Sequence, residues 1–96
     1  MSMEFEWDPK KATENFKKHG VPFHEAATVF GDPSSIPYED PTHSIGETRF
    51  ILMGTSVQGR ILMVSFTERK ERLRIISARE ATRRERRIYE EERFGV

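Results

Sequence analysis

The chain has 96 residues, of which 35% are hydrophobic and 33% charged, a composition that fits one small folded domain over residues 1–96. Sixteen Lys and Arg balance sixteen Asp and Glu, so the overall field gives a nucleic-acid partner no support. The absence of cysteine excludes disulfides and thiolate-bound metal sites. The charge is uneven, however. Residues 1–59 carry five basic and nine acidic side chains, whereas residues 60–96 carry eleven and seven, so the C-terminal part can present a basic surface.

The first half of the chain predicts one short strand followed by two helices. Met3–Trp7 alternates apolar and acidic residues with the period of two that is typical of a half-buried strand. Asp8-Pro9 favours a helix start, because Asp caps free amides and Pro has no amide to satisfy, and Gly20 favours its end. Pro22 opens a second helix before Gly31-Asp32-Pro33, with an apolar face formed by Phe23, Ala26, Ala27 and Phe30.

Beyond residue 33 the apolar period changes from that of helices to that of strands. Ser35–Glu39 predicts a weak strand at a sheet edge, since Pro37 lacks the amide that an inner strand needs. After a polar loop at residues 40–46, short turns separate three further predicted strands, which we expect to be antiparallel neighbours: Thr48–Val57, Arg60–Glu68 and Leu73–Ser77. The near-continuous apolar runs of the first two predict a central position in the sheet.

Residues 79–92 predict a polar terminal helix. Two capping boxes, Ser77-x-x-Glu80 and Thr82-x-x-Glu85, leave its first turn open between two positions. The predicted order is β-α-α-β-β-β-β-α, with the helices segregated from a mostly antiparallel sheet. This order places the chain in the α+β class.

No familiar cofactor or metal motif is present. The three histidines lack the spacing of a zinc helix, the glycines form neither a P-loop nor a dinucleotide fingerprint, and hydrolase nucleophile signatures are missing. The longest apolar runs contain four residues, and the first ten residues lack the basic and apolar regions of a signal peptide. We therefore expect a cytoplasmic protein with no metal, no cofactor and no membrane span, whose chemistry depends on His, Glu, Lys and Arg.

One group of candidate residues lies where the polar loop meets the first long strand. His43 is close in sequence to Glu47 and Arg49, which point to the same face of a strand. A base beside a cation is suited to deprotonating a hydroxyl and stabilising the negative charge that develops. The plainer alternative is a surface loop followed by a cross-strand ion pair.

Arginines around the last strand form a second group. Arg72 and Arg74 share one face of that strand, Arg69 lies before its turn, and Arg79 lies where the strand meets the helix. Arginine is suited to bidentate contacts with phosphate. A solvated sheet face is the alternative interpretation.

The last helix carries four arginines within residues 83–87. They can follow a phosphate backbone, pair with nearby glutamates as solvated charges, or bind an acidic protein partner. We place a partner interface on Arg83, Arg84 and Arg87. Sequence-specific DNA binding by this chain is not expected, because helix-turn-helix spacing and a net positive charge are both missing.

Most aromatic residues fall at periods typical of a core. We expect packing rather than base stacking for Phe5, Trp7, Phe16, Phe23, Phe30, Phe50 and Phe66. Tyr38 on the edge strand and Tyr89 on the last helix are the better candidates for exposure.

Three segments of the sequence resemble the BrnT family of bacterial toxins. They are FEWDPKKATENFKKHGVPFHEAATVF, the strand GETRF, and RIISAREATRRERRIYEE, so the similarity extends over nearly the whole chain. Families of this kind are small ribonucleases with a RelE-like fold, each encoded beside an antitoxin. The resemblance implies a toxin that cuts RNA without a metal ion and halts translation and growth. It also implies a BrnA-like antitoxin partner that supplies the DNA-binding element for autorepression.

Positions that match the family complete the candidate site. The catalytic set is His43, Glu47, Arg69 and Arg79, with Glu47 or His43 as the base and the two arginines as a phosphate clamp. The substrate-binding set is Lys18, His19, Arg49, Arg72, Arg74 and Tyr89. His19 is the weaker candidate for chemistry, since a role at the end of a helix explains it. The family commonly has a basic residue where this chain has Glu80. A carboxylate beside Arg79 would lower the local positive potential and weaken the nuclease, or Glu80 would instead improve the cap of the last helix.

A non-catalytic module that binds a protein or a nucleic acid is the alternative function. In that case the arginine helix and the sheet edge would bind the partner, and the pairing of His43 with Glu47 would be incidental. The two classes differ observably, because a nuclease is poorly tolerated when it is expressed alone and a binding module is harmless.

Overall fold

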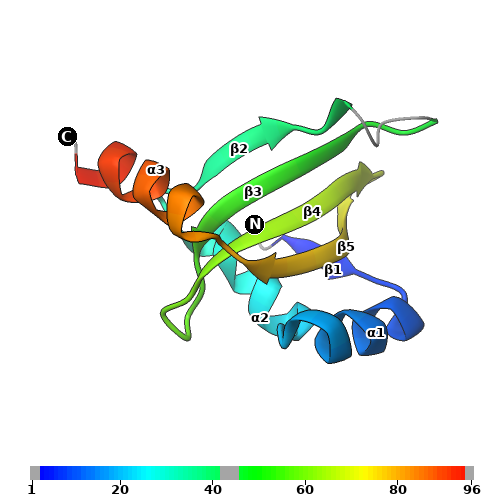
Figure 1. The fold of residues 1–96 in the computed structure, drawn as a ribbon. Helices are drawn as coiled ribbons and strands as arrows, with labels where there is room; N and C mark the ends of the chain where they lie inside the picture. Colours follow the sequence, from blue (N-terminus) through cyan, green and yellow to red (C-terminus); the bar gives the residue numbers. More distant parts are fainter. Residues whose placement is uncertain (1–2, 42–45, 95–96) are drawn as a thin grey trace.

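A single sheet organises the chain in the computed structural model, which describes residues 3–41 and 46–94. The order of elements in these ranges confirms the predicted α+β class, with one added 3-10 turn, η1 (Figure 1). The elements are β1 (Glu4–Glu6), α1 (Pro9–His19), α2 (Phe23–Thr28), η1 (Val29–Gly31), β2 (Ile36–Glu39), β3 (Arg49–Thr55), β4 (Ile61–Arg69), β5 (Arg72–Glu80) and α3 (Arg83–Phe94).

The strands lie in the order β1-β5-β4-β3-β2. Strands β3, β4 and β5 pair antiparallel, as the short turns between them predict. Strand β2 pairs antiparallel with β3, and β1 joins β5 in parallel. Both β3 and β4 have a neighbour on each side, which confirms their predicted central position. The strand that contains Pro37 lies at an edge of the sheet, which is the position predicted for a strand with a proline because it pairs on one side only.

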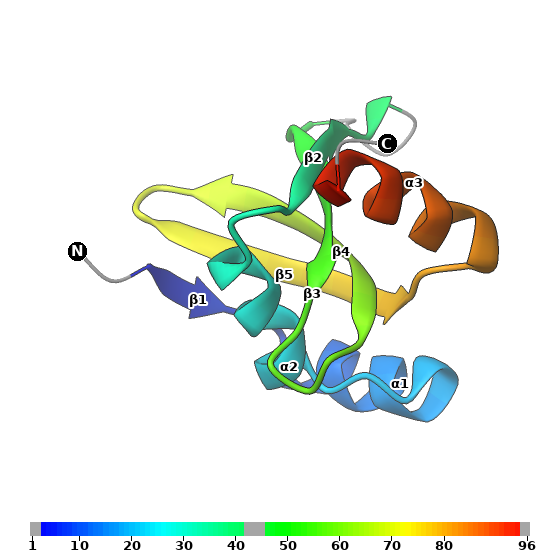
Figure 2. The same ribbon diagram turned by 90° about the vertical axis from the view of Figure 1, so that its left-hand side faces the viewer.

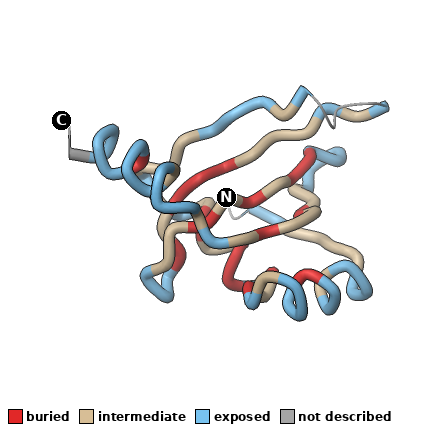
Figure 3. Tube along the Cα trace, viewed as in Figure 1, coloured by how far each residue is buried: buried red, intermediate tan, exposed pale blue. Residues whose placement is uncertain are grey.

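The core lies between this sheet and the pair α1 and α2, which cover one of its faces (Figure 2). Buried residues concentrate where the strands face α2, whereas α3 is mostly exposed (Figure 3). The buried cluster combines the segment after α1 with the middle of the sheet: Val21, Phe23, Ala26, Val29, Leu52, Leu62, Val64, Phe66, Ile75 and Ala78. The burial of this apolar surface is the main force that fixes the two helices on the sheet.

Helix α1 begins and ends at the residues that the sequence predicts. The Asp8 carboxylate accepts a hydrogen bond of 2.9 Å from the Lys10 amide, and Pro9 occupies the first helical position. Gly20 ends the helix with φ of 70°, a left-handed conformation that costs little only without a Cβ.

The buried side chain of Asn15 takes the place of a missing strand neighbour. β1 pairs only with Arg72–Arg74, so the rest of β5 has no strand on that side. Asn15 donates to the carbonyls of Ala78 (2.8 Å) and Val21 (3.0 Å) and accepts from the Ala78 amide (3.1 Å). The amide of Asn15 thus satisfies both polar backbone groups of Ala78, as a neighbouring strand would.

Helix α3 lies at one end of the sheet, apart from α1 and α2, and Tyr89 attaches it (Figure 1). The Tyr89 side chain is 1% exposed, and its hydroxyl donates to the Asp32 carboxylate and accepts from Thr55 Oγ1. Asp32 also accepts from the Thr55 amide. This close approach requires Gly54, because a Cβ there would lie 2.9 Å from a methyl group of Val29.

Three sequence predictions are wrong in detail. β5 extends to Glu80, so residues 79 and 80 belong to the strand rather than to the last helix. Tyr89 is buried rather than exposed, because Asp32 and Thr55 provide partners for its hydroxyl. Phe16, predicted to pack in the core, is 54% exposed on α1.

Replacing Asn15 with Ala should lower the free energy of unfolding by about 2–3 kcal/mol, because three buried hydrogen bonds lose their partner. The neighbouring exposed residue offers a control, since Glu14→Ala should change stability by less than about 0.5 kcal/mol. Urea denaturation followed by circular dichroism measures both. Equal stability of the two variants would contradict a role for Asn15 at the strand edge.

Candidate active site

A β-bulge in β5 shifts the alternation of its side chains. Ser77 is opposite Ser65 on β4, yet Ile75 is opposite Phe66, so Ile76 is an extra residue on β5. Side chains alternate between the two faces of a sheet, and one extra residue reverses the alternation for everything that follows. The residues of β5 after the bulge therefore exchange faces.

The reversed alternation brings Arg79 onto the same face as Arg72 and Arg74. This face is turned away from α1 and α2, and we call it the open face (Figure 2). The polar side chains that β3, β4 and β5 direct to this face include Arg49, Ser65, Thr67, Arg69, Arg72, Arg74, Ser77 and Arg79. The sheet thus directs a row of guanidinium groups to one surface.

Glu47 lies at one end of the open face, between two of these arginines. Its Oε1 is 3.7 Å from Arg49 Nε, and its Oε2 is 3.4 Å from Arg69 Nη2. The side chain of Glu47 is 32% exposed, so a ligand can reach the carboxylate. The structure therefore brings Glu47, Arg49 and Arg69 together, and the predicted His43 lies outside the described residues. A proton acceptor and two cations share this site.

Counter-charges from β1 face the next two arginines. Arg74 Nη1 is 2.7 Å from Glu6 Oε2, and Arg72 Nε is 3.4 Å from Glu4 Oε2. Both contacts follow the parallel pairing of β1 with β5, in which Glu4 is opposite Arg72 and Glu6 is opposite Arg74. These arginines line the open face and also hold the short β1 in register.

Arg79 is held in a bidentate pair by Glu85 of α3. Its Nη1 and Nη2 donate to the two carboxylate oxygens at 2.7 and 2.9 Å. The hydrogen bonds from Arg79 lower the pKa of Glu85 from 4.5 to about 2, despite an opposing effect of burial. Arg79 therefore faces a carboxylate that stays ionised at every physiological pH.

Glu85 also begins α3. Its Oε1 accepts from the Thr82 amide at 2.8 Å, and the Glu85 amide donates to Thr82 Oγ1 at 3.2 Å. This reciprocal pattern is a capping box, so Thr82-x-x-Glu85 is the one of the two predicted boxes that the chain uses. A single carboxylate thus caps the helix and orients the arginine that precedes it.

The predicted clamp of Arg69 and Arg79 on one phosphate stays a prediction, and the two arginines lie well apart in this structure. Arg79 is opposite Met63, and Arg69 is six residues further along β4, which is about 20 Å at roughly 3.3 Å per residue. Glu85 and Glu47 hold the two guanidinium groups at opposite ends of the open face.

Lys18 and His19 lie at the edge of β5 rather than beside Glu47. With Lys11 and Glu14 they line a shallow pocket of about 290 Å³ that includes Ile76 and Ser77 of the bulge. They are therefore nearer to the Arg79 end of the open face. Their predicted contact with substrate stays a prediction.

Tyr89, which we predicted to bind substrate, is part of the anchor of α3. Burial raises the pKa of its hydroxyl, and the hydrogen bond to Asp32 raises it further. With its ring buried and its hydroxyl bonded to Asp32 and Thr55, the side chain has no surface to offer RNA.

Glu80 does not face Arg79. It is opposite Leu62, on the helix-covered side of the sheet, and its carboxylate is 3.4 Å from Arg60 Nη1. Arg60 in turn donates to the buried Glu25 at 2.9 Å. The carboxylate that acts on Arg79 is that of Glu85, so the expected effect of Glu80 on the local potential is not supported.

Sequence reasoning missed Glu85 as the partner of Arg79 and the two facing serines, Ser65 and Ser77. The box Thr82-x-x-Glu85 was a signal for Glu85, since it placed that carboxylate in the first turn after Arg79. No sequence pattern indicated that the two serines face each other, because the bulge decides which residue of β4 lies opposite Ser77.

Within residues 3–41 and 46–94, no group of three or more His, Cys, Asp or Glu side chains is placed to hold a metal ion. Among the same residues, no helix has the length and apolar character needed to cross a bilayer. The predicted absence of a metal stays a prediction.

Replacing Glu85 with Gln should lower the free energy of unfolding by about 1–2 kcal/mol at pH 7, through loss of the ionic pair and weakening of the cap. The pKa of Glu85 is about 2 in the folded chain and near 4.5 when unfolded. Its contribution is therefore complete above pH 4.5 and is lost as the pH falls toward 2. The stability difference between wild type and variant should shrink over that range.

Thermal unfolding at several pH values between 7 and 2.5 measures this difference. Glu90→Gln, on an exposed position of the same helix, is the matched control and should follow the wild type throughout. A gap between Glu85→Gln and wild type that does not change with pH would contradict the role of the carboxylate charge.

Comparisons with known proteins bear on the fold and the family. A crystal structure of the Brucella abortus ribonuclease toxin BrnT is similar to this chain, with a TM-score of 0.67 and 24% sequence identity. The similarity covers 85% of this chain and all of that one, and it supports the α+β fold. A comparison with curated proteins gives no match.

The family comparison covers most of the chain. The sequence model of the family described as "Ribonuclease toxin, BrnT, of type II toxin-antitoxin system" matches residues 7–85. This range includes α1, α2, the whole of β2 to β5 and the Arg79–Glu85 pair. The chain therefore belongs to the BrnT family of ribonuclease toxins from type II toxin–antitoxin systems.

Proposed function

We propose that the open face binds single-stranded RNA and cleaves it without a metal ion at the end that holds Glu47. One observation carries the proposal: Glu47 lies within 3.7 Å of Arg49 and 3.4 Å of Arg69 on an accessible surface. Membership of a family of ribonuclease toxins supports RNA as the substrate.

The reaction requires a base, an acid and stabilisation of negative charge. Glu47, or His43 from the preceding loop, takes the proton from a ribose 2′-hydroxyl, and the oxygen attacks the adjacent phosphorus. The bond to the 5′-oxygen breaks, and an acid protonates that leaving oxygen. The pentavalent transition state carries more negative charge than the substrate, so Arg49 and Arg69 stabilise it more than they stabilise the bound RNA.

Arg79 has a different part in this scheme. Because Arg79 on β5 lies about 20 Å from Arg69 along the strand direction, it would bind another phosphate of the same RNA strand. The phosphate must compete with Glu85 for the guanidinium. Arg72 and Arg74 lie at the Glu47 end, opposite Arg69 and Thr67, and they would bind neighbouring phosphates there. Lys18 and His19 would contact RNA that extends past the edge of β5.

The biological setting follows from this activity. Cleavage of RNA in the cytoplasm would stop translation and growth, and a cognate antitoxin would neutralise the toxin. We propose that a BrnA-like antitoxin also supplies the DNA-binding element for autorepression. On this chain, exposed Arg83, Arg84 and Arg87 of α3 form a basic surface for an acidic segment of that partner.

Purified protein should cleave a long single-stranded RNA in excess EDTA. Glu47→Gln should lower kcat by about 100-fold or more, because it removes the base, while Arg79→Ala should mainly raise KM. Arg86→Ala, which removes an exposed cation of α3 outside the proposed site, is the control and should cleave as the wild type does.

Three results would contradict this assignment. Loss of cleavage in EDTA with rescue by a divalent ion would overturn the metal-free reaction. A loss of kcat confined to Arg79→Ala and His19→Gln would place the reaction at the other end of the open face. Intact RNA together with harmless expression of the toxin alone would favour a binding module.

The basic surface of α3 should contribute to antitoxin affinity through charge. Changing Arg83, Arg84 and Arg87 together to Gln should weaken binding of the cognate antitoxin and reduce its dependence on salt. Isothermal titration at 50 and 300 mM NaCl measures both effects. Unchanged affinity and salt dependence would remove α3 from the interface.

A further inference from the structure

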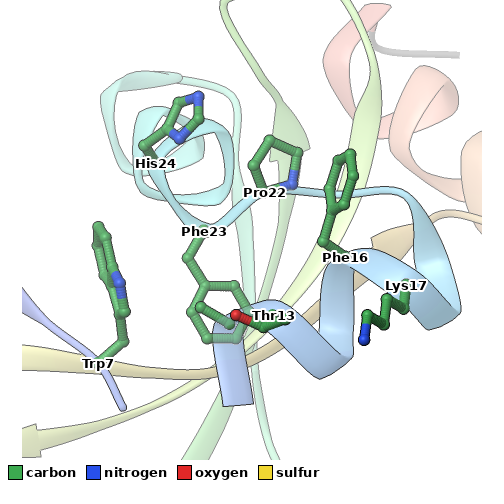
Figure 4. Close-up of a pocket in the computed structure, with 8 residues that line it drawn as sticks. Trp7, Thr13, Phe16, Lys17, Pro22, Phe23 and His24 are labelled. Atoms are coloured by element: carbon green, nitrogen blue, oxygen red, sulfur yellow. The ribbon is translucent and has the colours of Figure 1, made fainter. Parts of the chain in front are cut away.

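A second surface of the molecule lies on the outer side of α1 and α2, away from the open face. Here the two helices and the residue after β1 enclose a pocket of about 360 Å³ (Figure 4). Its lining combines aromatic and aliphatic side chains with a few polar ones: Trp7, Ala12, Thr13, Phe16, Lys17, Pro22, Phe23 and His24. None of these residues belongs to the proposed nuclease site.

Three aromatic rings shape this pocket. Figure 4 shows Trp7 and Phe16 on opposite sides, with Phe23 between them. Phe23 is 2% exposed and meets the Trp7 ring edge to face with 6.0 Å between centroids, so this part of the pocket is fixed by the core. Phe16 is 54% exposed on a helix. An exposed aromatic beside a preformed apolar hollow is typical of a protein-binding hot spot.

The polar groups around the pocket define what it prefers. Lys17 supplies a cation and His24 an imidazole, and no Asp or Glu lines the pocket. Within the described part of the chain, the indole N–H of Trp7 donates no hydrogen bond. An occupant that presents a bulky apolar side chain beside a carboxylate would fill the hollow, pair with Lys17 and accept from Trp7.

We propose that this pocket anchors the antitoxin through an apolar side chain flanked by an acidic residue. The chain belongs to a toxin–antitoxin family, so an antitoxin is the partner that its surface must bind. The inference rests on that partnership, and it does not require that the open face cleave RNA. The pocket provides affinity from the rear of the molecule, separate from the basic surface of α3.

The sole tryptophan of the chain gives a direct readout, because Trp7 lines the pocket. Toxin labelled with 5-fluorotryptophan should show one fluorine NMR signal, which should shift when the unlabelled cognate antitoxin is added. Addition of single-stranded RNA should leave the signal in place. A shift with RNA and none with the antitoxin would overturn the proposal and assign the pocket to substrate.

Two variants test the anchor itself. Phe16→Ala keeps a good helix former on an exposed position, and Lys17→Glu reverses the charge on the rim. Each should raise the Kd for the antitoxin by about tenfold or more. The matched controls are Val57→Ala, which truncates another exposed apolar side chain, and Lys11→Glu on another side of α1. Both controls should bind as the wild type does.

The outcomes separate this inference from the proposed function. Antitoxin affinity that is unchanged in both Phe16→Ala and Lys17→Glu would overturn the anchor, whatever the nuclease assay shows. Loss of RNA cleavage in Phe16→Ala with normal antitoxin binding would also overturn it. If wild type fails to cleave RNA while the Kd values follow the expected order, the anchor is supported and the proposed cleavage is not.

Discussion

The extra residue in β5 is the constraint on which the open face depends. Ile76 lets Ile75 and Ala78 both point into the core while Arg74 and Arg79 both point away from it. A regular strand would direct Arg79 toward the helices, where burial of an unpaired guanidinium is costly. The bulge also lies beside the stretch of β5 that β1 does not cover. There Asn15 replaces a strand and keeps the backbone hydrogen-bonded.

Paired charges explain how a chain of zero net charge presents a row of arginines. On the open face Glu47 contacts Arg49 and Arg69, and Glu85 contacts Arg79, just as β1 glutamates contact Arg72 and Arg74. RNA bound there must exchange these carboxylates for phosphates. The exchange costs least at the Glu47 end, where the contacts are 3.4 Å or longer, and most at the bidentate pair of Arg79.

Local patterns predicted the elements well because caps, turns and periods act over a few residues. Asp8, Pro9 and Gly20 set α1, and Pro37 set an edge strand, through their own backbone chemistry. The resemblance to the BrnT family predicted a RelE-like fold and combined the candidate residues into one catalytic set. Features that depend on distant partners were missed or wrong. Periodicity does not reveal a bulge, so the sequence could not predict which face of the sheet Arg79 occupies or how far it lies from Arg69. The burial of Tyr89 against Asp32 could not be predicted either, because the two residues are far apart in the sequence.

The proposed nuclease surface and the proposed antitoxin pocket meet at β1. Trp7, which lines the rear pocket, follows β1 directly, and Glu4 and Glu6 of β1 face the arginines at the edge of the open face. A partner anchored beside Trp7 would need to cross only this three-residue strand to reach Arg72. An acidic segment on that path would replace Glu4 and Glu6 as the counter-charge. In this scheme, an antitoxin anchored on the opposite face would neutralise the toxin by occupying the arginines that we propose to bind phosphate.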